Sequence, residues 1–101
     1  MQVTFVSEMK EDCLLISVKG RLDTLHAINF IDSIEPLMKT ANSMVLDMAE
    51  LEYISSAGLR ALLMAHKTMS NKGGLTILHA NETVTEVLEV TGFCDILNIV
   101  K

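Results

Sequence analysis

Two consecutive serines, Ser55 and Ser56, form the pattern in this chain that is best suited to chemistry. They follow an apolar segment at residues 44–48 and a polar stretch, and apolar residues at helical spacing follow them. This order predicts a buried strand, a turn and a helix that begins at the serines. Unpaired backbone N–H groups and the helix dipole favour negative charge at a helix start. A serine hydroxyl there can therefore accept a phosphate without disruption of the fold.

Other side chains give no comparable pattern for catalysis or for a bound cofactor. Glu50 and Glu52 lie beside the serines, but nothing in the sequence supplies a second catalytic group, a G-x-S-x-G elbow or a P-loop. The three histidines are too scattered for a metal site, and the two cysteines lack C-x-x-C spacing. We expect a protein that is not an enzyme, needs no cofactor or metal and keeps Cys13 and Cys94 as buried free thiols.

The composition predicts a single domain over residues 1–101. Half of the residues are hydrophobic, which is enough for a core, and only 4% are aromatic. The net charge of −5 disfavours nucleic acid and anionic membranes, which attract cationic surfaces. The first residues lack the features of a secretion signal, and no window holds about 18 uninterrupted apolar residues. We therefore expect a cytoplasmic, monomeric protein without a membrane segment.

The first residues predict a hairpin of two strands. Apolar residues alternate with polar ones at 3–5, and the same alternation returns at 14–18. The charged stretch at 8–12 is expected to form the turn between these strands. Gly20 is expected to end the second strand.

A helix and a central strand are expected next. Asp23 or Thr24 can cap a helix over 25–41, where apolar residues recur at helical spacing. Pro36 lies inside this run, so we expect a kink or two short helices there. Residues 44–48 are nearly all apolar, which is typical of a strand covered on both faces.

The second half of the chain predicts two more strand–helix units and a last strand. The expected elements are a helix over 56–72, a strand over 75–78, a helix after Asn81 and a strand over 96–100. Gly73-Gly74 and Gly92 are expected to end the two helices. Asn81 caps the later helix, or Thr83 and Glu86 form a capping box instead. The order β-β-α-β-α-β-α-β predicts an α/β fold with a mixed, largely parallel sheet.

Three motifs resemble those of a known family. Residues 20–23 (GRLD), 47–59 (DMAELEYISSAGL) and 90–93 (VTGF) match the motifs of the STAS domain family in order and spacing. The middle motif is the most specific of the three, and their order and spacing extend the resemblance over nearly the whole chain. The sequence is similar to the bacterial anti-sigma factor antagonists of this family, which carry a phosphorylatable serine. The resemblance implies a single STAS-like domain.

The resemblance also implies a regulatory role for Ser56. In the family, the anti-sigma factor is itself a serine kinase that phosphorylates this serine, and a separate serine phosphatase removes the phosphate. The unphosphorylated protein would bind the anti-sigma factor and free a sigma factor, so that transcription is regulated indirectly. Asp23 would lie near this helix start and engage a basic partner residue, and Gly58 would allow the partner a close approach. The implied partner-binding residues are Asp23, Thr24, Ser55, Ser56, Ala57, Gly58 and Leu59.

Two residues of the middle motif and the residue that follows it differ from the common family pattern. Ser55 stands where aspartate is frequent, Ala57 where a second serine is frequent, and Arg60 where some relatives carry glycine. The sequence Ser-Ser-Ala-Gly is itself a family variant, so the phosphorylation site is retained. We expect Arg60 to affect the choice of partner.

Simpler roles are open for the same residues. Ser55 and Ser56 could be helix caps only, Asp23 could cap its own helix, and Asp47 could close a strand end and order the next turn. The chain could also be a STAS subunit of a lipid-transport complex or a stress-sensing assembly, without a phosphorylation switch. A small serine hydrolase is a third alternative, although the sequence shows no base for Ser56.

Overall fold

The chain begins with an antiparallel hairpin and continues through three crossovers that return each time to the same sheet. The computed structural model describes residues 4–100. Its elements are β1 (Thr4–Lys10), β2 (Cys13–Leu22), α1 (Thr24–Thr40), β3 (Ser43–Ile54), α2 (Ser56–Met69), β4 (Leu75–Leu78), α3 (Glu82–Val90), a 3₁₀ turn η1 (Phe93–Asp95) and β5 (Asn98–Val100). The predicted order of strands and helices is confirmed, and η1 is an addition that the sequence analysis missed.

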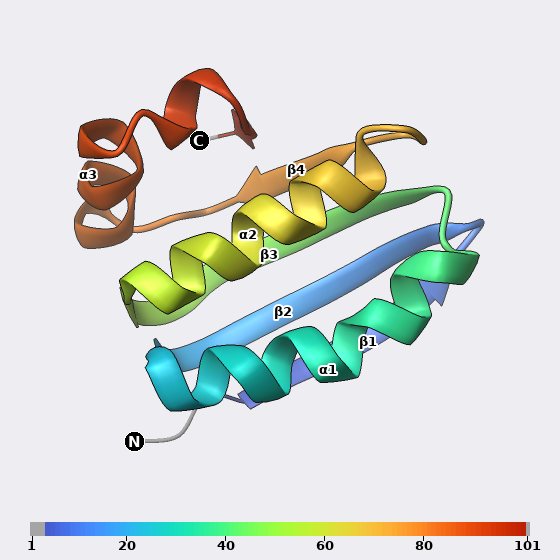
Figure 1. Ribbon diagram of the computed structural model, residues 1–101, viewed down its shortest axis with the longest axis horizontal. Helices are drawn as coiled ribbons and strands as arrows, with labels where there is room; N and C mark the ends of the chain where they lie inside the picture. The colour runs from blue at the N-terminus through green and yellow to red at the C-terminus, as the bar shows by residue number, and fades with distance from the viewer. Residues whose placement is uncertain (1–3, 101) are drawn as a thin grey trace.

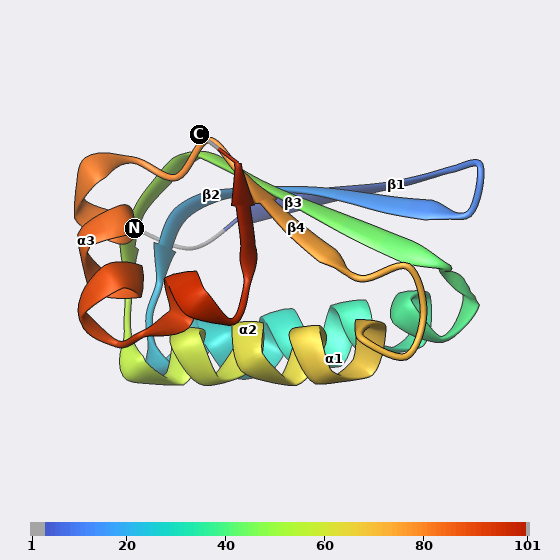
Figure 2. The same ribbon diagram turned by 90° about the horizontal axis from the view of Figure 1, so that it is seen from above.

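The sheet is mixed and largely parallel, as predicted. Its strand order is β1-β2-β3-β4-β5, in which β1 runs antiparallel to β2 and the other neighbours are parallel. Helices α1 and α2 lie side by side on one face of the sheet, and α3 lies at one end of the molecule (Figures 1 and 2). No helix between residues 4 and 100 is long and apolar enough to cross a membrane.

The hydrophobic core fills the space between the sheet and the helix layer. Alternate residues of β2 point into it, and α1 contributes one apolar stripe. The largest fully buried side chains are Phe30, Leu14, Ile16, Leu22, Ile34, Met38, Met44, Leu46, Met48, Leu51, Leu62 and Met69. Each buried side-chain nitrogen or oxygen among the described residues has a hydrogen-bond partner. This core fixes the sheet ends from which the helices start.

The hairpin turn is shorter than predicted. Strand β1 continues to Lys10, which pairs with Cys13, so only Glu11 and Asp12 form the turn. Both have positive φ, 52° and 67°, which matches the twist of a two-residue hairpin loop. The charged stretch was wrongly assigned because charge does not prevent an edge strand. The part of the first expected strand at residue 3 lies outside the described residues.

Strands β2 and β3 both run further than predicted, and this extension positions the site. Gly20 does not end β2, because its positive φ of 92° lies at a shift in register that lets both strands bend and continue together. The expected turn after Met48 is likewise strand, up to Ile54. Asp47 closes no strand end; its Oδ1 accepts the Ala49 N–H at 3.0 Å inside β3.

Helix α1 is continuous through Pro36, so the expectation of two short helices is wrong. Pro36 removes one hydrogen bond to the carbonyl of Asp32, and both residues are exposed. Water can satisfy that carbonyl, and the buried stripe of α1 continues on the opposite side through Ile34 and Met38. Tertiary packing therefore overrides the local helix-breaking tendency.

Helix α2 ends at Met69, three residues earlier than predicted. Lys72 instead leaves the helix and donates from Nζ to the carbonyls of Met38 at 2.7 Å and Ala41 at 2.9 Å. It thereby satisfies the free carbonyl end of α1 and complements the helix dipole. Gly74 has a positive φ of 90°, as expected for the exit from the helix.

The start of α3 agrees with one of the two predicted caps. Asn81 Oδ1 accepts the Val84 N–H at 2.8 Å, and its Nδ2 donates to the Leu51 carbonyl at 2.7 Å. The capping box of Thr83 and Glu86 is therefore not the cap of this helix. The last strand is shorter than expected because η1 leads into it.

Candidate functional site

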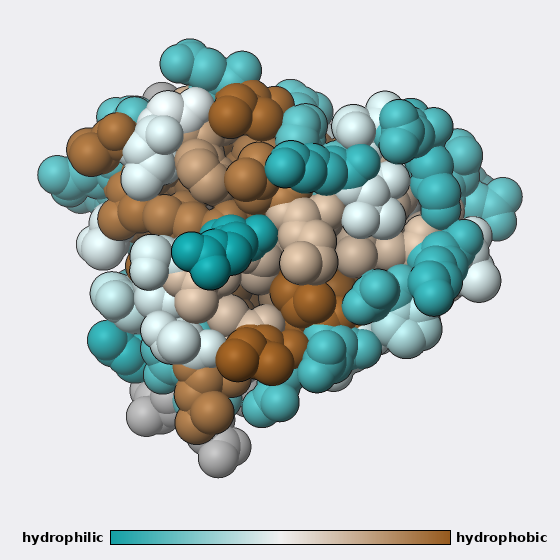
Figure 3. Space-filling view, in the orientation of Figure 1, coloured by the Kyte–Doolittle hydropathy of each residue, from teal (hydrophilic) through white to brown (hydrophobic). Residues whose placement is uncertain are grey.

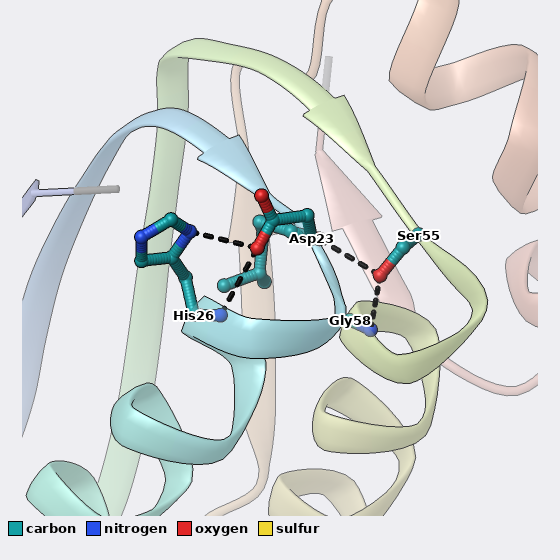
Figure 4. A network of polar contacts seen from close by, with 5 residues as sticks. Asp23, His26, Ser55 and Gly58 are labelled. Carbon is teal, nitrogen blue, oxygen red and sulfur yellow. Dashed lines mark hydrogen bonds and ion pairs between the residues drawn. The ribbon is translucent and has the colours of Figure 1, made fainter. Parts of the chain in front are cut away.

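The starts of α1 and α2 lie next to one another because β2 and β3 end side by side. Leu22 pairs with Ile54 at the last position of these strands. The Leu22 carbonyl then accepts two hydrogen bonds from Ser55, one from its N–H at 3.0 Å and one from its Oγ at 3.1 Å; Figure 4 shows the Oγ bond. One serine therefore joins the first turn of α2 to the residue that precedes Asp23.

Ser55 is the structural cap of α2. Its Oγ accepts the Gly58 N–H at 3.1 Å while it donates to Leu22, and the residue is only 9% exposed. Its extended backbone is the conformation that a helix cap requires. The hydroxyl is thus fully occupied inside the fold. Of the two serines, Ser55 has the capping role that the sequence analysis left open for both.

Ser56 is the first residue of α2 and is exposed. The Gly58 and Leu59 N–H groups donate to Ser55, so the N–H groups of Ser56 and Ala57 remain as the free donors of this helix start. Among residues 4–100, the Ser56 hydroxyl makes no hydrogen bond within the protein that would be lost if it were modified. The site therefore combines an accessible hydroxyl with a positive local field.

Asp23 caps α1 and is only partly covered. Its Oδ1 accepts the His26 N–H at 3.0 Å and lies 2.7 Å from His26 Nδ1. The hydrogen bond from the His26 backbone, reinforced by the His26 side chain and Arg21, holds the pKa of Asp23 below its usual value despite partial desolvation. Asp23 is therefore an ionised carboxylate at the helix start beside Ser55. Thr24, the first residue of α1, is exposed.

Gly58 and Leu59 face the interior, which corrects the expectation for Gly58. A Cβ on Gly58 would lie 2.7 Å from Ile54 Cγ1 and 2.8 Å from the Leu22 carbonyl oxygen. The missing side chain thus lets α2 pack closely on the strand ends and leaves no room for a partner. Leu59 is 8% exposed and belongs to the core. These two residues shape the site from within.

An apolar groove between α1 and α2 adjoins the site, and the sequence analysis did not find it. Its volume is about 290 Å³, and it begins at Thr24 and Ala57 beside Ser56. Exposed side chains line it, among them Ile28 at 60% and Met64 at 46%. Hydrophobic side chains gather over the two helices, with hydrophilic ones around them and also among them (Figure 3). The sequence did contain a signal for this groove, because α1 and α2 carry more apolar residues than one buried stripe on each helix requires.

Asp47 and His79 form a further pair of titratable groups, away from the corner where α1 and α2 begin. His79 Nδ1 is 3.1 Å from Asp47 Oδ1. Burial raises the pKa of Asp47, but the Ala49 N–H and His79 outweigh it, so the net direction is downward. Between residues 4 and 100, no cluster of three or more histidine, cysteine or acidic residues could hold a metal. Cys13 and Cys94 are free but only partly buried, which corrects the expectation of full burial.

A family model for the STAS domain matches residues 4–101. The chain belongs to the STAS domain family. BtrV of Bordetella bronchiseptica, a relative that carries the name of an anti-sigma factor antagonist, is 39% identical over 62 residues, which are 60% of this chain and 53% of BtrV. The matched part thus spans about half the length of BtrV. The anti-sigma-B factor antagonist of Bacillus subtilis is 21% identical over 100 residues, 98% of this chain and 92% of that protein.

Two solved structures of the anti-sigma factor antagonist SpoIIAA share the fold of this STAS domain. The unphosphorylated form has a TM-score of 0.83 at 18% identity, over 97% of this chain and 89% of the other. The phosphorylated form, described as a Bacillus cell fate determinant, has a TM-score of 0.76 at 17% identity, over 97% and 92% of the two chains. At these identities the likeness shows the fold alone.

Proposed function

We propose that this STAS domain is an anti-sigma factor antagonist whose partner binding is switched off by phosphorylation of Ser56. The observation that carries the proposal is the different placement of the two serines. Ser55 is buried and caps α2, whereas Ser56 is the exposed first residue of the helix. A phosphate on Ser56 therefore leaves the cap intact. Relatives named as anti-sigma factor antagonists support this function.

The proposed partner is an anti-sigma factor that is also the serine kinase for Ser56, and a serine phosphatase reverses the modification. The partner contacts the accessible residues of the two helix starts, namely Asp23, Thr24, Ser56 and Ala57. The Asp23 carboxylate is ionised and offers a pairing site for a basic partner residue. Gly58 and Leu59 hold the shape of this surface from inside. The protein acts as a monomer in the cytoplasm, without nucleic acid or membrane contact of its own.

The switch follows from charge. Phosphorylation adds about −1.5 to −2 charges at neutral pH, and a helix start tolerates this charge in the free protein. A partner packed against the neutral serine would instead bury the charge, at a cost of several kcal/mol unless it is paired. Each 1.4 kcal/mol changes the affinity about tenfold. One phosphate can therefore release the partner without refolding of the domain.

The test is to capture the partner from the native host with three tagged versions of the chain. These are the wild type, Ser56→Glu and the control Ser70→Glu, which places the same charge on an exposed serine at the other end of α2. We expect wild type and Ser70→Glu to retain one protein with a serine-kinase domain, and Ser56→Glu to lose at least 90% of it.

Equal retention by Ser56→Glu would contradict the switch. Capture of transporter subunits in place of a kinase would contradict the antagonist function and favour a STAS subunit of another system. Thermal melting of the three proteins shows that each variant is folded before the comparison is made.

A further inference from the structure

Arg60 carries a positive charge that no described residue neutralises. The chain has two arginines, and Arg21 lies 4.3 Å from the centre of the Tyr53 ring. None of the ion pairs among residues 4–100 includes Arg60. The side chains three and four positions from it on α2 are those of Ser56, Ala57, Leu63 and Met64. Its own helix therefore offers it no carboxylate.

Helix geometry directs Arg60 towards Ser56. Residues four apart on a helix lie on the same face, with their Cβ atoms about 5–6 Å apart. Helical side chains lean towards the N-terminus, so the Arg60 side chain covers the preceding turn, where Ser56 begins the helix. Both residues are exposed, so neither is held away by packing. A group attached to Ser56 Oγ lies within reach of the guanidinium.

The other charged groups near this corner are three carboxylates and the Arg21 guanidinium, which lies over the Tyr53 ring and acts on Asp23. Asp23 is ionised and paired with His26 at the start of α1, and Asp32 lines the same groove as Arg60. Glu52 is exposed near the end of β3, and the chain carries a net charge of −5. A phosphate placed here meets repulsion from these carboxylates. A guanidinium is the side chain best shaped to offset it, because it binds phosphate through two parallel hydrogen bonds.

We propose that Arg60 binds the phosphate on Ser56, holds it against the first turn of α2 and so sets the charge state of the phosphoserine. The inference rests on the proposed function, because it concerns the phosphorylated form of that site. Arg60 acts here as a positioning residue. The negative charge becomes a fixed part of the partner-binding surface instead of moving on a free side chain.

The test uses the full chain with phosphoserine installed genetically at position 56, so that no kinase is needed. A ³¹P NMR titration then gives the second pKa of the phosphate. Removal of the guanidinium by Arg60→Gln is expected to raise this pKa by about half a unit, because a nearby cation favours the dianion. Arg60→Lys keeps the charge but lacks the planar guanidinium. The second pKa of its phosphate is expected to lie between the values of the wild type and Arg60→Gln.

Lys67→Gln is the matched control. It removes one exposed cation from the same helix, eleven residues beyond Ser56. That distance is about 16 Å along the helix, beyond the Debye length of about 8 Å at physiological salt. The pKa should therefore not move in this variant. An unchanged pKa in Arg60→Gln, or an equal rise in Lys67→Gln, would overturn the inference.

The outcome is separable from that of the proposed function. An unmodified Ser56 in the native host would argue against the switch, yet the titration would still show whether Arg60 binds a phosphate placed there. An unchanged titration with a confirmed phosphate in the host would remove only the role of Arg60.

Discussion

The two helix starts of this protein are built alike but differ in where their polar groups lie. Asp23 and Ser55 each cap a helix by accepting an N–H from three residues ahead, and an exposed hydroxyl follows each cap, on Thr24 and Ser56. The cap of α1 is a partly exposed carboxylate, which is negative whenever the protein is folded at neutral pH. The cap of α2 is a buried hydroxyl that also binds the Leu22 carbonyl.

This difference shows how one corner can hold a constant charge and a variable one. At α1 the same carboxylate stabilises the helix and faces solvent, so its loss of charge on protonation also weakens the cap. At α2 the cap is buried, and the neighbouring Ser56 hydroxyl makes no helix-stabilising hydrogen bond to the residues that the structure describes. Only the second arrangement allows a charge to be added and removed while the helix stays in place.

The largest expected effect on stability comes from a substitution at the third residue of α2, compared with the same position in α1. This position is His26 in α1 and Gly58 in α2, where a Cβ would meet the Leu22 carbonyl oxygen at 2.8 Å. We expect Gly58→Ala to lower the free energy of unfolding by about 1–3 kcal/mol, because a strand backbone cannot move aside. Urea unfolding measures the change, with Ala57→Gly at the neighbouring, half-buried position as a control. A neutral result would mean that α2 is not packed as tightly as described.

Removal of each serine hydroxyl tests whether the cap and the exposed site are separate. We expect Ser55→Ala to cost about 1–2 kcal/mol, because it removes a helix cap and a buried hydrogen bond. Ser56→Ala should stay within about 0.5 kcal/mol of the wild type, since it removes an exposed group. Both values come from the same urea titrations. Equal losses in the two variants would contradict the different roles of the serines.

The carboxylate cap of α1 predicts a smaller effect that depends on pH. The folded-state pKa of Asp23 lies below the ordinary value of 3.8. Its ionised form therefore stabilises the fold above pH 3.8, and this contribution is lost as the pH falls through the lowered pKa. Asn is also a good cap but does not titrate, so the wild type should lose stability relative to Asp23→Asn on acidification.

Thermal melting of the wild type and Asp23→Asn from pH 6 to about pH 2.5 measures this difference. Asp47, whose pKa is also lowered, is present in both proteins, and its contribution cancels. A difference between the two proteins that stays constant over this range would contradict the ionised cap.

The sequence predicted the elements of this corner better than their ends. Hydrophobic spacing and the polar caps indicated α1, α2 and the parallel strands, because burial of one helix face and one cap leave local signals. The continuation of β2 and β3 to Leu22 and Ile54 left none, since their polar residues resemble a turn until the two strands pair. The same pairing decides that Gly58 faces Leu22 and Ile54, which a motif cannot show.

The groove and the free charge of Arg60 were missed for a related reason. Each depends on which faces of α1 and α2 lie next to one another, and this is settled by the crossovers of the whole sheet. The family resemblance implied that Asp23 lies near the start of α2. The structure places it there, because the parallel strands β2 and β3 end side by side.

Peptide mapping by mass spectrometry of the protein from its native host, in growing and in stressed cells, is the most direct test of phosphorylation at Ser56. We expect one phosphate on Ser56 in at least one condition, none on Ser55, and loss of that phosphate on treatment with a phosphatase. A Ser56 that stays unmodified in every condition, or a phosphate found on Ser55 instead, would contradict this expectation.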